Sequence, residues 1–145
     1  MSYFIFADGA SRGNPGPAGY GTVCFQAESI ADIPDLTQFM ENPSKAYFQK
    51  YESLGIKTNN EAEYMGLIAA LEECMNHNLQ HVQIFMDSEL VVKQMKKEYK
   101  VKNDRLQILW NKANILNGKC RATISHVRRE KNSIADYLAN LSYKS

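Results

Sequence analysis

Short apolar runs alternate with longer segments of helical spacing along this chain of 145 residues. Runs rich in aromatic and β-branched residues predict strands at 3–7, 20–26, 46–54, 81–86 and 121–127. Helical spacing and helix-end signals predict helices at 58–75, 88–97, 104–116 and 133–141. Three hairpin-linked strands followed by alternating helices and strands predict an α/β fold, a mixed sheet with helices on both faces.

Local signals refine the ends of these elements. Asp8 and Gly9 predict a turn that closes the first strand, and Asn117-Gly118 predicts the end of the third helix. Thr58 and Glu61 have the spacing of a capping box, which gives Glu61 a structural role. Residues 27–45 lack periodicity and contain two prolines, so we treat them as an unassigned insertion with one helical turn near 35–40. The length predicts a single domain, residues 1–145.

The N-terminus has no basic region and no long apolar stretch, which predicts a cytoplasmic protein without a membrane segment. Three cysteines, Cys24, Cys74 and Cys120, are widely spaced and lack a C-x-x-C pair, so we expect small core residues rather than disulfides or a zinc site.

The net charge of +1 hides a strong polarity along the chain. Residues 1–92 hold 4 basic and 12 acidic side chains, whereas residues 93–131 hold 12 basic and 3 acidic ones. A basic segment beside an acidic one suits an enzyme that binds a polyanion and holds cations, although solvated helix faces would give the same charge pattern.

Four acidic residues stand near predicted element ends: Asp8, Glu63, Asp87 and Asp136. Taken singly, each has an ordinary explanation, as a turn former, a residue in the first turn of a helix, a helix N-cap and a solvated helix position. Carboxylates that converge at one sheet edge repel each other unless cations lie between them, and oxygen ligands favour Mg²⁺ or Mn²⁺. Such a site is suited to metal-assisted phosphodiester hydrolysis.

Two further polar residues accompany this set. Asn60 lies about 60° from Glu63 around the predicted helix, so an amide donor would share a face with a metal-binding carboxylate. His126 ends the last predicted strand, where a histidine is either a proton carrier or a structural residue.

Four blocks closely resemble type 1 ribonuclease H over nearly the whole chain except about 27–45. They are Asp-Gly-Ala-Ser-Arg-Gly-Asn-Pro-Gly-Pro-Ala-Gly-Tyr-Gly at 8–21, Thr-Asn-Asn-Glu-Ala-Glu at 58–63, Met-Asp-Ser-Glu at 86–89 and His-Val-Arg-Arg-Glu-Lys-Asn-Ser-Ile-Ala-Asp at 126–136. The first block is highly specific, and all four occur in the family's order.

The resemblance implies a ribonuclease H-like five-stranded sheet in the order 3-2-1-4-5 with strands 1 to 3 antiparallel. It implies an endonuclease that hydrolyses the RNA strand of RNA/DNA hybrids to 5′-phosphate and 3′-hydroxyl ends, and we expect a monomer. Two Mg²⁺ ions roughly 4 Å apart, replaceable by Mn²⁺, would be held by Asp8, Glu63, Asp87 and Asp136, with His126 as a further catalytic residue. The implied nucleic-acid contacts are Gly9, Ser11, Asn14, Thr58, Asn60 and Ser88, to which the basic segment adds Lys96, Lys97, Lys100 and Lys102.

The chain departs from better-known members in lacking a long tryptophan-rich basic protrusion after Asp87 and in carrying Val127-Arg128-Arg129 after His126. Three alternatives stay open at this point. They are a catalytically silent hybrid-binding module, a nuclease of the same fold acting on double-stranded RNA or DNA junctions, and an α/β domain with a small-molecule pocket. For the last of these, the sequence contains no phosphate-loop motif.

Overall fold

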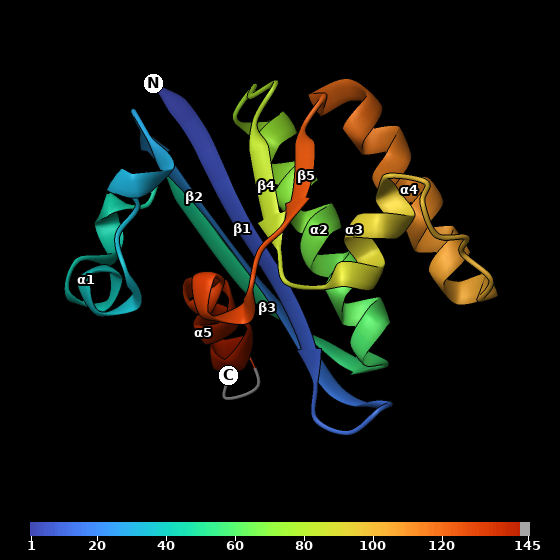
Figure 1. The fold of residues 1–145 in the computed structure, drawn as a ribbon. Helices are drawn as coiled ribbons and strands as arrows, with labels where there is room; N and C mark the ends of the chain where they lie inside the picture. Colours follow the sequence, from blue (N-terminus) through green and yellow to red (C-terminus); the bar gives the residue numbers. More distant parts are fainter. Residues whose placement is uncertain (143–145) are drawn as a thin grey trace.

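A five-stranded sheet forms the centre of the computed structural model, which describes residues 1–142 (Figure 1). Its strands lie in the order β3-β2-β1-β4-β5. β1 and β3 pair antiparallel with β2, while β4 pairs parallel with β1 and β5 parallel with β4. The predicted mixed sheet and its strand order are therefore confirmed. The strands are Ser2–Ser11, Gly16–Ala27, Phe48–Lys57, Gln83–Met86 and Thr123–His126, numbered β1 to β5.

β1 continues through Asp8, so the predicted turn at Asp8 and Gly9 is wrong. Asp8 pairs with Gly21, and pairing with β2 extends to Ser11. The reversal lies at residues 12–15 instead, closed by a 2.8 Å bond from the Arg12 amide to the Pro17 carbonyl. Asp8 thus sits on a paired strand rather than on a loop, which holds its backbone rigidly.

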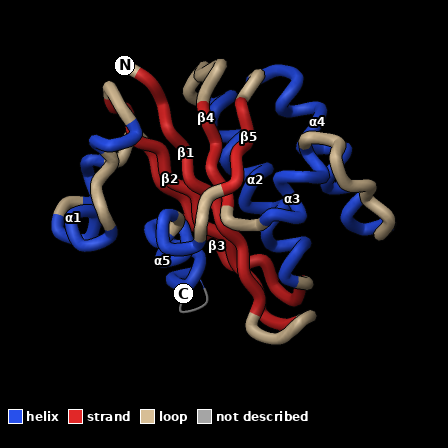
Figure 2. The backbone as a smooth tube through the Cα atoms, in the orientation of Figure 1, coloured by secondary structure: helices blue, strands red, loops and turns tan. Residues whose placement is uncertain are grey.

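Helices cover both faces of this sheet (Figure 2). The larger elements are α2 at Asn59–Asn76, α3 at Glu89–Met95, α4 at Asp104–Cys120 and α5 at Ser133–Ser142. On one face, α2 packs its buried Leu67 and Leu71 into a core with Ile5 and Ile84, and α4 packs against α2. On the other face, α5 packs Leu138 against Val23 and its neighbours. None of the helices within residues 1–142 is long and apolar enough to cross a membrane.

Side-chain caps set where these helices begin. Thr58 and Glu61 form the predicted capping box at the start of α2. Ser88, rather than Asp87, caps α3 by accepting a bond from the Val91 amide, so the ordinary explanation of Asp87 as an N-cap is wrong. Since its side chain is not needed for the helix, the Asp87 carboxylate is left for another role.

α4 runs past Asn117-Gly118 to Cys120, beyond its predicted end. The stop comes instead at Arg121, which has a left-handed backbone and donates its amide to the Asn117 carbonyl. The Asn117 carboxamide bonds both main-chain groups of Ala122, which directs the chain into β5. Tertiary and capping contacts therefore override the turn propensity of Asn-Gly here.

Residues 27–45 contain the predicted helical turn as α1, Leu36–Glu41, whose N-terminus is fixed by a capping box between Asp35 and Gln38. Short 3₁₀ turns at Ile30–Asp32 and Pro43–Lys45 flank it. Phe39, buried, packs edge-on against Phe25 with ring centroids 6.2 Å apart. The insertion therefore extends the core on the α5 side of the sheet, and α1 lies near α5 in Figure 1.

Candidate active site

Asp8 and Asp87 are brought together by the parallel pairing of β1 and β4. Phe6 pairs with Phe85, and each aspartate follows its phenylalanine by two residues. Because side chains alternate along a strand, positions two residues beyond a matched pair project to the same side. The strand register therefore brings the end of β4 beside β1 at Asp8, and Asp87 is the first residue after β4.

Two glycines let α2 approach β1 closely enough to add Glu63. A Cβ atom on Gly9 would lie 2.0 Å from the Ala62 carbonyl oxygen, and one on Gly66 would lie 2.7 Å from the Asp8 carbonyl oxygen. Neither position tolerates a larger residue without moving the helix. The packing of helix on strand thus aims Glu63 at Asp8.

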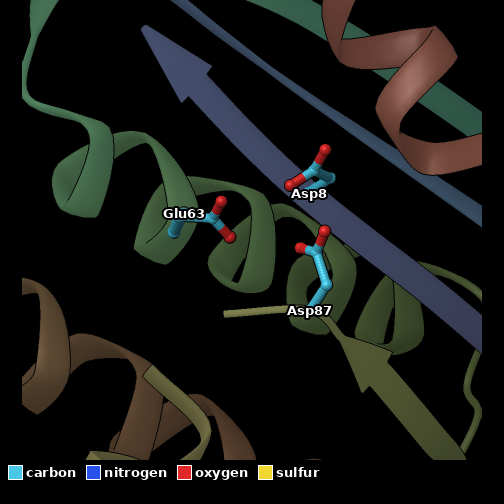
Figure 3. Close-up of side chains that lie close together, drawn as sticks. All are labelled: Asp8, Glu63 and Asp87. Carbon is cyan, nitrogen blue, oxygen red and sulfur yellow. The ribbon is translucent and has the colours of Figure 1, made fainter. Parts of the chain in front are cut away.

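The three carboxylates form a tight cluster, in which one ligand oxygen from each lies within 4.8 Å of the others. Figure 3 shows Asp8 rising from β1, Glu63 from α2, and Asp87 from the end of β4. Such a separation suits oxygen atoms that share a cation.

Burial and mutual repulsion strongly perturb this cluster. Burial, followed by the charges of Asp87 and Asp136, raises the pKa of Asp8 to about 8. Burial, followed by the charges of Asp8 and Asp87, raises the pKa of Glu63 well above its ordinary value. The Glu63 Oε2 atom is buried and has no hydrogen-bond partner in the described residues. An oxygen-only donor set with an unsatisfied buried oxygen is what a divalent cation would complete.

Asp136 reaches the same place from α5. It lines a pocket of about 360 Å³ together with Asp8, Gly9, Ala10, Asn59, Glu63, Asp87, Ser88 and Arg129. Gly21 allows this approach, because a Cβ atom there would lie 2.6 Å from the Ala135 carbonyl oxygen. All four acidic residues singled out in the sequence therefore share one pocket, with Asp136 outside the tight cluster of three.

Asn132 supports the cluster and was not selected from the sequence. It is 1% exposed, and its Nδ2 donates to the Ala7 carbonyl at 3.0 Å and to Asp87 Oδ1 at 3.5 Å. It therefore ties the segment before α5 to β1 and to Asp87. Its position four residues before Asp136, and so on the same helical face, was the available signal.

Arg129 and Asn59 are further pocket residues that sequence reasoning missed as individual positions. In the sequence, Arg129 stood out only as part of the block at 126–136 and as one of the twelve basic residues of 93–131. Asn59 lines the pocket beside Glu63, which lies four residues further along the same face of α2, whereas Asn60 is not among the pocket-lining residues. The role of Asn60 stays a prediction.

His126 ends β5 opposite Met86, is exposed, and is not among the residues that line the acidic pocket. The hydrogen bond and charge of Lys93 lower the pKa of Glu89, and His126 makes a smaller contribution in the same direction. The histidine therefore lies within electrostatic reach of α3. Its catalytic role stays a prediction.

The predicted contact residues Ser11 and Asn14, at the reversal between β1 and β2, are hydrogen-bonded to the start of α2. Asn14 Oδ1 accepts from the Asn59 amide at 3.1 Å, and Asn59 Oδ1 accepts from the Ser11 amide at 3.3 Å. The Ser11 hydroxyl donates to the Gly13 carbonyl, and Thr58 and Ser88 use their hydroxyls as helix caps. Loop and helix thus present one continuous polar rim beside the pocket.

The four predicted lysines lie elsewhere. Lys96, Lys97, Lys100 and Lys102 are exposed in the connector between α3 and α4 and do not line the acidic pocket. Any contact with a substrate at the pocket would require a ligand long enough to reach both places.

Comparison with known proteins supports this description. Residues 40–142 match the family described as "Reverse transcriptase-like". The chain is 39% identical over 141 residues to "Bifunctional protein Rv2228c" of Mycobacterium tuberculosis, covering 97% of this chain and 35% of that protein. It is 35% identical over 138 residues to "Ribonuclease HI" of Halobacterium salinarum, covering 93% of this chain and 61% of the relative. The chain therefore spans about a third and about three fifths of these two proteins.

The fold comparison agrees. The structure of "LC11-RNase H1 in complex with RNA/DNA hybrid" superimposes with a TM-score of 0.82 at 33% identity, covering 99% of this chain and 97% of that one. The family match over residues 40–142, the 35% identity to "Ribonuclease HI" and the superposition with an RNase H1 structure at 33% identity lead to one assignment: the chain belongs to the type 1 ribonuclease H family.

Proposed function

We propose that this protein is an endonuclease that hydrolyses the RNA strand of RNA/DNA hybrids and leaves 5′-phosphate and 3′-hydroxyl ends. The observation that carries the proposal is the meeting of Asp8, Glu63, Asp87 and Asp136 in one pocket from four separate segments of the chain. A relative of the same fold binds an RNA/DNA hybrid. Carboxylates gathered in this way serve metal-assisted phosphodiester hydrolysis.

The residues of the pocket fit divalent cations. Asp8, Glu63 and Asp87 would hold them, with Asp136 completing the set on the side of α5. We propose two Mg²⁺ ions, with Mn²⁺ able to replace them, because hard oxygen donors favour these metals. When bound, such ions activate a water molecule and stabilise the leaving 3′ oxygen.

The remaining pocket residues would position the substrate. Arg129 brings a positive charge into an acidic pocket, where a phosphate group of the cut strand would be attracted. The rim formed by Ser11, Asn14 and Asn59, with Thr58 and Asn60 nearby, offers amide and hydroxyl groups. Such groups contact ribose hydroxyls and phosphates without requiring a base sequence, which suits discrimination of RNA from DNA by the 2′-hydroxyl.

A cleavage assay with end-labelled RNA/DNA, RNA/RNA and DNA/DNA duplexes in Mg²⁺ tests the proposal. We expect RNA to be cut only in the hybrid, and EDTA to stop the reaction. Cleavage of double-stranded RNA or of DNA alone would favour another nuclease of this fold. Tight binding to hybrids without cleavage in Mg²⁺ or Mn²⁺ would indicate a silent binding module. A monomeric state and a cytoplasmic location stay predictions.

A further inference from the structure

Gln94 is a buried polar residue outside the acidic pocket, and all of its side-chain hydrogen-bonding groups connect different parts of the fold. It lies in α3 and is 3% exposed. Its Oε1 accepts a 2.5 Å bond from the Tyr64 hydroxyl of α2. Its Nε2 donates to the main-chain carbonyl of Lys100 at 3.3 Å. A buried glutamine with both ends satisfied specifies one arrangement of its partners.

The orientation of this amide follows from its partners. The Lys100 carbonyl can only accept a hydrogen bond, so the NH₂ group must face it. The oxygen then faces Tyr64, which must donate. Burial raises the pKa of Tyr64 above its ordinary value, so this hydroxyl keeps its proton. Reversal of the amide would leave two acceptors facing each other.

The main chain of Gln94 adds two more connections. Its carbonyl accepts from the indole Nε1 of Trp110 in α4 at 3.0 Å and from the Lys97 amide at 3.0 Å. α2, α4 and the connector between α3 and α4 are therefore all bonded to one residue. Tyr64, at one end of this chain of contacts, directly follows Glu63 in the sequence.

The connector has other contacts at Tyr99 and Val101. Lys93 Nζ donates to the Tyr99 hydroxyl at 3.3 Å, and Val101 packs, partly buried, against the core. Residues 96–100 are exposed, and Lys97 has a left-handed backbone with φ of 66°. Two further bonds, from the amides of Glu98 and Tyr99 to the Lys93 carbonyl, stay within the α3 end. The bond from Gln94 adds a buried side-chain anchor for the main chain at Lys100, between the contacts of Tyr99 and Val101.

We propose that Gln94 is a positioning residue that holds Lys96, Lys97, Lys100 and Lys102 at a fixed distance from the acidic pocket, so that a nucleic-acid backbone bound at one is in register with the other. This inference rests on the proposed hybrid nuclease function. A connector that is already ordered loses less conformational entropy when it binds phosphates, which strengthens binding without changing the chemical step.

Two variants test this role. Gln94→Met keeps the approximate length and volume but removes both side-chain hydrogen bonds, and Tyr64→Phe removes only the anchor to α2. We expect the KM for hybrids to rise about three- to tenfold in Gln94→Met, and less in Tyr64→Phe, with kcat changed by less than about twofold. The salt dependence of KM should become flatter, because fewer lysines contact phosphate at once.

Asn117→Ala is the matched control. Asn117 also holds a connecting segment against its helix, because its carboxamide makes two hydrogen bonds to the main chain of Ala122. This contact lies at the opposite end of α4. Asn117→Ala should lower the melting temperature while leaving KM and its salt dependence at the wild-type values. If a general loss of stability were the cause of a raised KM, KM would rise in all three variants alike.

A second test places Gln94→Met in a protein whose four connector lysines are changed to Gln. If Gln94 acts through these lysines, it should raise KM no further there. The inference is overturned if folded Gln94→Met keeps the wild-type KM and salt dependence, or if its effect persists without the lysines.

If Gln94→Met does not fold, Tyr64→Phe tests the inference by its KM and salt dependence. Amide hydrogen exchange at 97–102 should also be faster in this variant than in the wild-type protein. Unchanged KM, salt dependence and exchange in that variant would overturn the inference. Failure of the wild-type protein to bind or cleave hybrids would instead refute the proposed function.

Discussion

Close packing between backbones determines the chemistry of individual residues in this protein. Gly9 and Gly66 allow α2 to touch β1, so Glu63 lies beside Asp8 in a setting where neither carboxyl is easily ionised. Glu61, two residues earlier, lies in the same helix but bonds the Thr58 amide at 3.0 Å. The backbone bond to Thr58 lowers the pKa of Glu61. Two nearby glutamates thus have opposite electrostatic environments.

Asp8→Asn and Asp87→Asn should each nearly abolish cleavage while leaving the fold intact. Each change removes a candidate metal ligand and also relieves repulsion within the cluster, so metal-free stability should hold or rise. Cleavage rates in Mg²⁺ and thermal unfolding in EDTA would check both parts. Normal hydrolysis by either folded variant would remove that residue from the site.

Glu61→Gln and Glu63→Gln form a matched pair. Glutamine at 61 can still complete the capping box, so activity should survive, whereas glutamine at 63 removes a charge from the acidic cluster and should nearly abolish cleavage. Rates for the two variants, measured with circular dichroism as a folding control, decide the question. The reverse pattern would contradict the assignment of roles within α2.

His126→Ala should slow turnover by about 10- to 100-fold, less than the loss of a carboxylate. A positioned proton carrier typically contributes about 10²- to 10⁴-fold, and this histidine lies outside the pocket. Turnover of the folded variant and of the wild-type protein at saturating hybrid is the measurement. Unchanged turnover would indicate a structural or surface histidine.

At the scale of elements, the connector between α3 and α4 is a second charged region, and its lysines do not line the acidic pocket. It carries the four exposed lysines, and the buried Gln94 side chain bonds its main chain at Lys100. A hybrid long enough to span pocket and connector would meet a negative site that holds cations and a positive surface that holds phosphates.

Changing Lys96, Lys97, Lys100 and Lys102 together to Gln should raise the KM for hybrids and change turnover at saturation little. The log–log salt dependence of binding should flatten by up to about 4, because each phosphate contact releases about one counterion. Hybrid binding from low to moderate salt in both proteins is the measurement. Identical slopes would mean that these lysines are only solvated.

For the molecule as a whole, stability and metal binding should depend on pH in opposite directions. The unfolded chain releases the Asp8 proton near pH 4, whereas the folded protein keeps it to about pH 8. The protonated group therefore contributes stability below about pH 4, and this contribution is lost as the pH rises to about 8. Mg²⁺ needs deprotonated ligands, so the stability that it adds should grow over the same range.

Thermal unfolding between pH 4 and 8, in EDTA and in Mg²⁺, tests this behaviour. Relative to wild type, Asp8→Asn should show a weaker fall of melting temperature with pH in EDTA and a smaller gain from Mg²⁺. All other titrating groups are the same in the two proteins, so the difference between their pH dependences reports on the acidic cluster. Equal pH dependence of the two proteins in EDTA would contradict the raised pKa.

Features that depend on neighbouring residues could be predicted from the sequence. The five strands and main helices follow from periodicity, and the capping box of Thr58 and Glu61 follows from spacing within one turn. The four carboxylates were identifiable because each stands in a distinctive local motif. Such signals act over a few residues, so they survive in the linear order of the chain.

Only the tertiary structure decided the contacts between distant segments. Asn132 bonds the carbonyl of Ala7 across 125 positions, and Asn14 anchors Asn59 across 45. The extension of β1 past Asp8 depends on pairing with β2, and the choice of Asn59 over Asn60 depends on how α2 packs on β1. These outcomes follow from packing and from satisfying buried polar groups, which local sequence signals do not encode.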